Sequence, residues 1–270
     1  MTSLHSPVMP NPEIPAAPAS FGPAARFALY YAPPVTSPWW PAGCAWLQRD
    51  PSSSVVLSPP DVPGLSRPLA ELTSEPRRYG WHATLVAPFT CRPGIDGPAV
   101  LQLATDWAAR QQGFTLPARV ALLERFVALQ AAIRHTSGAA EEAALRALAA
   151  DAVRTFAPLR AAPGAAEVAK RRKMQLSARQ EALMLEWGYP FVFDEFRFHL
   201  TLSNSVAAAD AQIMLDWWAR QMEVLGPLPI DGAAIYVQPQ PGADFLLWQR
   251  LPFGATGAAC GIDLTRTSAL

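Results

Sequence analysis

The sequence predicts an α+β protein made of two related lobes, in which antiparallel sheets flanked by helices face a central cleft. The main observation is a short motif that occurs twice, first within residues 77–89 and again within residues 196–203. Both copies read aromatic residue, histidine, apolar residue, threonine, leucine. Around the two copies, the predicted strands and helices follow one another in an order that roughly doubles. Half of the 270 residues are hydrophobic, which is enough for a sizeable core.

The chain divides into three predicted parts. Residues 1–25 are crowded with Pro, Ala and Ser. We predict a disordered extension there, because such a segment buries too little apolar surface to order itself. Residues 26–253 are expected to form the bilobal domain, and residues 254–270 a loose C-terminal tail.

In the first half of the domain, the aromatic-rich run 26–31 is typical of a strand. A helix is expected from Ser37, since proline follows this capping residue, and a short helix around 68–73. The first motif strand should cover 81–90, and apolar residues at helical spacing predict a helix over 98–112. The segment 116–133 indicates a hairpin that turns at Glu124 and Arg125.

In the second half, high helix propensity favours helices over 141–156 and 165–188, the latter broken near 175–178. The second motif strand is expected at 196–205 and a helix at 208–225. Two final strands, 230–238 and 244–252, should be joined by a turn at Pro241 and Gly242.

Alternation within each motif indicates which way the side chains point, because successive residues of a strand face opposite sides. In the first copy, His82 and Thr84 should project from the face opposite Trp81 and Leu85. In the second copy, the residues expected to project together are His199, Thr201 and Ser203.

Each motif strand therefore offers an imidazole beside a hydroxyl. Imidazole is the side chain best suited to move protons near neutral pH. With the strands side by side, one histidine could remove a proton while the other supplies one, as cleavage of a phosphodiester requires. Two distant copies of one pattern thus predict a single shared site with His82 and His199 as catalytic groups.

Composition limits the partners. Lys and Arg total 22, as do Asp and Glu, so the formal charge is zero and a long nucleic acid is an unfavoured ligand. Three widely spaced cysteines, the lack of a long apolar run and the lack of a secretory signal pattern favour a cytoplasmic protein without a membrane span. We expect a small phosphorylated substrate and a monomer.

The motifs and their flanks resemble a known family. The paired His-x-Thr segments at His82 and His199 look like the signatures of the 2H phosphoesterase superfamily. The stretches 77–85, 187–190 and 194–199 resemble the branch described as phosphonate-metabolism proteins, which are often encoded in phosphonate-utilisation operons. The resemblance extends from about residue 26 to residue 253.

This resemblance implies a bilobal fold with pseudo-two-fold symmetry and metal-independent cleavage of a cyclic or 2′,5′-type phosphodiester. It implies that His82 and His199 are general base and general acid, in an order left open, and that Thr84 and Thr201 bind the non-bridging phosphate oxygens. The operon context suggests a ribosyl cyclic phosphate as substrate. The chain departs from the branch after the second motif, where Ser203-Asn204-Ser205 replaces a Thr-Gly or Thr-Asp pair followed by a basic residue.

Other residues are weaker candidates. Tyr79 could bind phosphate or simply pack, and Arg197 could grip phosphate oxygens from the face of the second histidine. The basic run 170–173 is more typical of a solvated helix face than of a phosphate or RNA contact. His and Asp at ligand spacing are too few for a metallohydrolase, so no metal or cofactor is expected.

The predicted function is therefore a metal-independent cyclic phosphodiesterase for a small phosphorylated sugar or nucleotide. Two alternatives stay open. One is a non-catalytic module that binds a phosphorylated ligand or an RNA end, and the other is an enzyme that processes RNA 2′,3′-cyclic phosphate ends.

Overall fold

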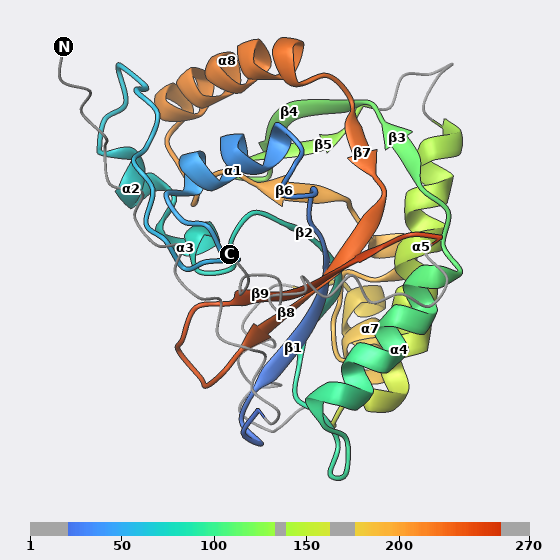
Figure 1. The fold of residues 1–270 in the computed structure, drawn as a ribbon. Helices are drawn as coiled ribbons and strands as arrows, with labels where there is room; N and C mark the ends of the chain where they lie inside the picture. Colours follow the sequence, from blue (N-terminus) through green and yellow to red (C-terminus); the bar gives the residue numbers. More distant parts are fainter. Residues whose placement is uncertain (1–20, 133–138, 163–175, 255–270) are drawn as a thin grey trace, which may run out of the picture.

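The computed structural model describes residues 21–132, 139–162 and 176–254 (Figure 1). Most of the predicted extension and tail, the basic run 170–173, His5 and His135 lie outside these residues. Within the described part of the chain, no helix combines the length and the apolar character that a membrane span requires.

One antiparallel sheet of seven strands organises the protein, in the order β4-β5-β6-β2-β1-β8-β9 (Figure 1). Its strands are β1 (Arg26–Tyr31), β2 (Ala83–Phe89), β4 (Ala118–Leu123), β5 (Phe126–Ala131), β6 (His199–Thr201), β8 (Gly232–Gln238) and β9 (Leu246–Pro252). A second sheet pairs β3 (Phe114–Leu116) with β7 (Leu228–Ile230).

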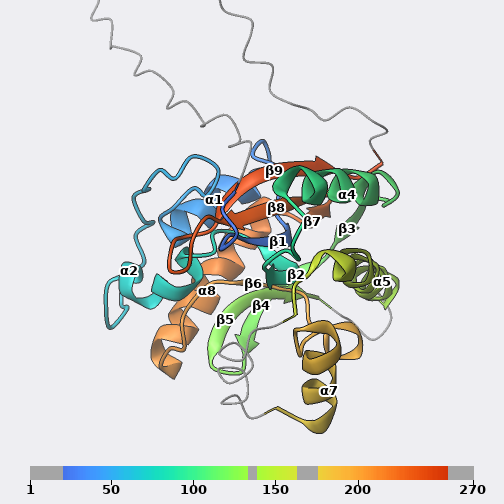
Figure 2. The same ribbon diagram turned by 90° about the horizontal axis from the view of Figure 1, so that it is seen from below.

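The helices form two groups on either side of the strands. Figure 2 shows α4, α5 and α7 together on one side and α1, α2 and α8 on the other. Their bounds are α1 (Trp39–Leu47), α2 (Leu69–Leu72), α3 (Ser74–Arg77), α4 (Gly97–Ala109), α5 (Ala139–Phe156), α7 (Ala178–Trp187) and α8 (Ala208–Leu225). Short 3₁₀ turns lie at Ala157–Leu159 and Phe193–Glu195.

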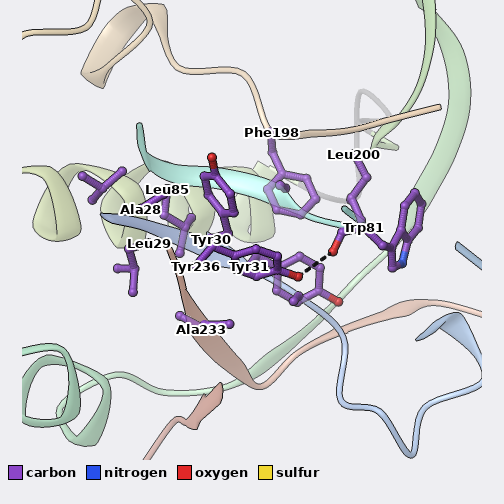
Figure 3. Packing of buried hydrophobic residues seen from close by; sticks show 14 of the residues in the cluster. Ala28, Leu29, Tyr30, Tyr31, Trp81, Leu85, Phe198, Leu200, Ala233 and Tyr236 are labelled. Carbon is purple, nitrogen blue, oxygen red and sulfur yellow. Dashed lines mark hydrogen bonds between the residues drawn. The ribbon is translucent and has the colours of Figure 1, made fainter. Parts of the chain in front are cut away.

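The register of the large sheet places apolar side chains in rows on one face. One such row crosses all seven strands, and all of its members except the half-buried Val120 are buried: Val120, Leu129, Leu200, Ala83, Tyr31, Ala233 and Leu251. Figure 3 shows part of this packing, with Trp81, Leu200, Phe198 and Tyr31 close together. Burial of these side chains supplies the main stabilisation of the sheet. The neighbouring row on the opposite face includes the polar side chains of Arg119, Gln130, His199 and Thr84.

The α+β class with antiparallel pairing is confirmed, and most of the predicted elements are present. The strand at 26–31 and the helix at 208–225 have the predicted bounds. The hairpin turns at Glu124, whose φ is 55°. The helical stretch 165–188 is described only from residue 176, and within it Ser177 caps α7 through a capping box with Gln180.

The bilobal arrangement stays a prediction. The strand order contains two groups, β4-β5-β6 and β2-β1-β8-β9, which meet where β2 pairs with β6. The two groups are thus joined edge to edge in one sheet.

The second motif strand was predicted too long. It was expected at 196–205, but β6 contains only His199–Thr201. A 3₁₀ turn precedes it, and the chain after it is held by the buried hydroxyl of Ser203, which accepts a hydrogen bond from Val127 N at 2.9 Å. Ser203 therefore binds backbone instead of projecting beside His199 and Thr201.

Candidate active site

The two motif strands are neighbours in the middle of the sheet. Ala83 of β2 pairs with Leu200 of β6 in antiparallel register. This register places His82 opposite Thr201 and Thr84 opposite His199, because residues on either side of a pair are also opposite each other. The four polar side chains therefore share the face opposite the buried row, and all four are half-buried.

The two imidazoles are oriented by equivalent hydrogen bonds. His82 Nδ1 lies 2.8 Å from the carbonyl oxygen of Gly80, and His199 Nδ1 lies 2.8 Å from that of Arg197. A carbonyl oxygen can only accept, so each Nδ1 carries the proton that it donates. In the neutral form of each ring, Nε2 is then the atom that has a free lone pair for proton transfer.

Gly80 provides the conformation that this bond needs at the first histidine. Its φ is +79°, in the region that glycine adopts most readily. Trp81, the next residue, is completely buried and stacks on Trp218 of α8 at 5.7 Å between ring centroids. The Tyr236 hydroxyl donates to the carbonyl of Trp81 at 3.2 Å, the dashed line in Figure 3. The backbone that carries His82 is thus held from both sides.

Aromatic rings surround His82. Tyr30 of β1 stacks on the imidazole at 3.9 Å between centroids, and Tyr79 lies at 6.0 Å. The pKa of His82 is lowered to about 4, mainly by burial and to a smaller extent by nearby His199, and these effects outweigh the bond to the Gly80 carbonyl, which raises it. His82 is therefore neutral at neutral pH.

His199 has a less enclosed environment, with the ring of Phe126 at 5.8 Å. Burial is the main cause that lowers its pKa, and the Arg197 guanidinium contributes, whereas the Arg197 carbonyl and the Glu124 carboxylate oppose this effect. The two histidines thus differ in electrostatic setting although their orienting bonds are the same.

Each of the two weaker candidates lies near one of the histidines. Tyr79 stacks on Phe245 at 5.2 Å, so it packs and also borders the site near His82. Arg197 is exposed, on the side of His199. The contacts of Tyr79 and Arg197 with the substrate therefore stay predictions.

The segment before His82 has a structural role. Arg77 donates from Nε to the Leu47 carbonyl at 3.0 Å and from a terminal nitrogen to the Ala70 carbonyl at 2.7 Å. Buried Arg49 donates to the Phe245 carbonyl at 2.5 Å. These bonds fix the segment that presents Tyr79 and Gly80.

The departure after the second motif also has a structural role. Asn204 accepts from Glu75 N at 2.9 Å and donates to the Glu71 carbonyl and the Ser74 hydroxyl, both at 2.9 Å. It ties the end of the second motif to α2 and α3. In this chain the segment 203–205 therefore anchors β6 beside β2.

Tyr30 was missed by sequence reasoning. Its strand, 26–31, was predicted, but the pairing of β1 with β2 that brings Tyr30 against His82 is not visible in the sequence. Tyr30 lies opposite Thr84, next to a bulge where β2 takes one more residue than β1. Across the described ranges, no group of three or more His, Cys, Asp or Glu is placed to hold a metal ion.

The chain is similar to one protein family and to two curated proteins. A family model described as "Protein of unknown function (DUF1045)" matches residues 84–246. The chain is 39% identical over 241 residues to the ribose 1,5-bisphosphate phosphokinase PhnN of Janthinobacterium sp. (strain Marseille), which covers 86% of this chain and 51% of that protein. It is 36% identical over 222 residues to the protein of the same name from Laribacter hongkongensis (strain HLHK9). That match covers 82% of this chain and 50% of the relative. The chain therefore spans about half the length of the curated relatives it matches.

Proposed function

The chain belongs to the DUF1045 family of proteins of unknown function, and we propose that its paired histidines form a metal-independent cyclic phosphodiesterase of the 2H phosphoesterase type. The substrate is a small phosphorylated sugar. The observation that carries this proposal is the register of β2 and β6, which places two imidazoles and two threonine hydroxyls on one face with both Nδ1 atoms already bonded.

The chemistry needs one base and one acid. One Nε2 removes a proton from water as its oxygen attacks phosphorus. The other Nε2 is protonated. It gives its proton to the leaving ester oxygen of the cyclic phosphate as the P–O bond to that oxygen breaks. The product is a phosphate monoester beside a free hydroxyl. Thr84 and Thr201 donate hydrogen bonds to the non-bridging oxygens, where charge increases in the transition state.

We propose an assignment of these roles from the environments of the two histidines. His82 is the base, because its pKa of about 4 keeps it neutral and able to accept a proton. His199 is the acid, because it lacks a stacked tyrosine, and although burial also lowers its pKa, the Arg197 carbonyl and the Glu124 carboxylate oppose that shift. The assignment predicts a bell-shaped dependence of kcat/KM on pH. A His82 variant should lose the acidic limb, and a His199 variant should lose the alkaline limb.

The names of the relatives support a ribosyl substrate. Opening a ribosyl 1,2-cyclic phosphate that carries a 5-phosphate, by breaking the bond to the 2-oxygen, gives ribose 1,5-bisphosphate. That compound is the one the relatives' name says they phosphorylate. A hydrolase joined to such a kinase would supply its substrate, which fits the resemblance to phosphonate-metabolism proteins and a cytoplasmic setting.

The kinase name itself does not transfer to this chain. A P-loop kinase binds ATP through G-x-x-x-x-G-K-[ST], and no Gly-Lys pair occurs in the 270 residues. We assign the kinase reaction to the half of each relative that this chain does not match.

The test is turnover of ribosyl 1,2-cyclic phosphate and nucleoside 2′,3′-cyclic phosphates with a chelator present. We expect activity that resists the chelator, prefers the ribosyl compound and falls by about 10²- to 10⁴-fold in His82→Gln and in His199→Gln. Thr84→Val and Thr201→Val should each cost about 10²-fold. Thr115→Val, an exposed threonine of β3, is the matched control and should keep full activity.

Two results would contradict the proposal. Activity that the chelator abolishes and added metal restores would replace the mechanism. Binding of the cyclic phosphates without any turnover would favour the non-catalytic module.

A further inference from the structure

A hollow lies where β4, β5 and the segment before His199 meet α5. Its cavity volume is about 320 Å³. The sheet contributes Arg119 of β4 and Gln130 of β5, α5 contributes Glu142 and Arg146, and the segment before β6 contributes Phe196 and Arg197. It is open to solvent on one side and is not part of the histidine pair.

The hollow carries excess positive charge. Arg146 donates to the Glu142 carboxylate at 2.9 Å, so these two charges offset each other. Arg119 and Arg197 are exposed, and within residues 21–132, 139–162 and 176–254 neither forms an ion pair with a carboxylate. Two guanidinium groups facing one hollow suit an anion with several oxygens, such as a phosphate.

The strand register connects this hollow to the catalytic pair. Arg119 pairs with Gln130, and Gln130 pairs with His199. The three residues therefore point to the same face in one row. Two strand spacings separate the Cα atoms of Arg119 and His199, roughly 10 Å. A pentose with a phosphate at each end has a length suited to this separation.

We propose that the hollow formed by Arg119, Gln130 and Arg197 is a second-phosphate subsite. It binds a phosphate monoester at the far end of the sugar whose cyclic phosphate lies between His82 and His199. The inference rests on the proposed function and narrows its substrate class to sugar phosphates that carry two phosphates. It gives Arg197 and Arg119 a role in specificity and none in proton transfer.

The kinetic test compares ribosyl 1,2-cyclic phosphate with and without a 5-phosphate. We expect the wild-type protein to prefer the 5-phosphorylated compound, mainly through a lower KM. In Arg119→Gln and in Arg197→Gln this preference, measured as the ratio of the two kcat/KM values, should fall by about tenfold or more, as expected for a lost hydrogen bond to a charged group. Arg110→Gln removes an exposed charge at the end of α4 and should leave the ratio unchanged.

A binding test separates this inference from the proposed function. Calorimetry with ribose 1,5-bisphosphate and ribose 1-phosphate needs no turnover. Weaker binding of the bisphosphate in Arg119→Gln, with a smaller change for the monophosphate, supports the subsite even where no hydrolysis occurs. Equal changes for both ligands, or no change for either, overturn the subsite even where hydrolysis is intact.

Discussion

At His82, three neighbours set the chemistry of one imidazole. The Gly80 carbonyl fixes the tautomer, Tyr30 covers one ring face and the nearby His199 disfavours a second positive charge. Of these three neighbours, only Gly80 belongs to the same motif as His82, whereas Tyr30 and His199 come from other strands. The proton affinity of His82 is therefore determined by packing between strands.

This packing predicts that stability depends on pH. The unfolded chain binds a proton at His82 below about pH 6.5, whereas the folded chain does so only near pH 4. Stability should therefore fall as the pH decreases from about 6.5 to about 4, by at most about 1.4 kcal/mol per pH unit from this residue. Urea unfolding at several pH values measures the slope.

His82→Gln should flatten that slope, and His199→Gln should also flatten it, because burial lowers the pKa of His199 as well. If the unfolding free energy of the wild-type protein and of His82→Gln changed with pH in parallel, the His82 imidazole would not be desolvated in the folded protein.

At the scale of elements, α1 positions the first motif through one close approach. Gly43 lies in α1 against the indole ring of Trp81, and a methyl group at this position would overlap that ring. A glycine inside a helix normally costs about 1 kcal/mol relative to alanine. Its presence here lets α1 pack directly on the residue before His82.

Gly43→Ala should therefore destabilise the protein, because the overlap outweighs the gain in helix propensity. We expect a net loss of about 1–3 kcal/mol in thermal or urea unfolding, together with lower activity as Trp81 and His82 move. Gly22→Ala, with no atom within 4 Å of the new methyl group, is the control and should be close to neutral. A stabilised Gly43→Ala variant would contradict the close contact.

The elements also show what the sequence could predict. Long patterns such as 208–225 and repeated ones such as the two motifs were visible, because their signals are local. The strands β3 and β7 were missed, since three residues cannot show alternation. The short β6 depends on Ser203 and Asn204 bonding to distant backbone, and the place of Tyr30 and Arg119 depends on strand order. Such features follow from tertiary pairing, which one sequence does not reveal.

For the whole molecule, the candidate site lies where the two groups of strands meet. The pair Ala83 and Leu200 joins β2 to β6, and each group contributes one histidine and one threonine. A phosphate held by both threonines would add contacts between the two groups. Binding should then stabilise both strands together.

Ribose 1,5-bisphosphate at about 100 times its dissociation constant should therefore raise the unfolding free energy by about 2.7 kcal/mol. This corresponds to an increase in Tm of roughly 5–10 °C for a chain of this size. Amide exchange should slow in β2 and β6 alike, because the ligand opposes separation of the two groups. Thr84→Val combined with Thr201→Val should remove both effects. Slower exchange in only one of the two strands would place the ligand away from the meeting point of the two groups and contradict a site shared by both motifs.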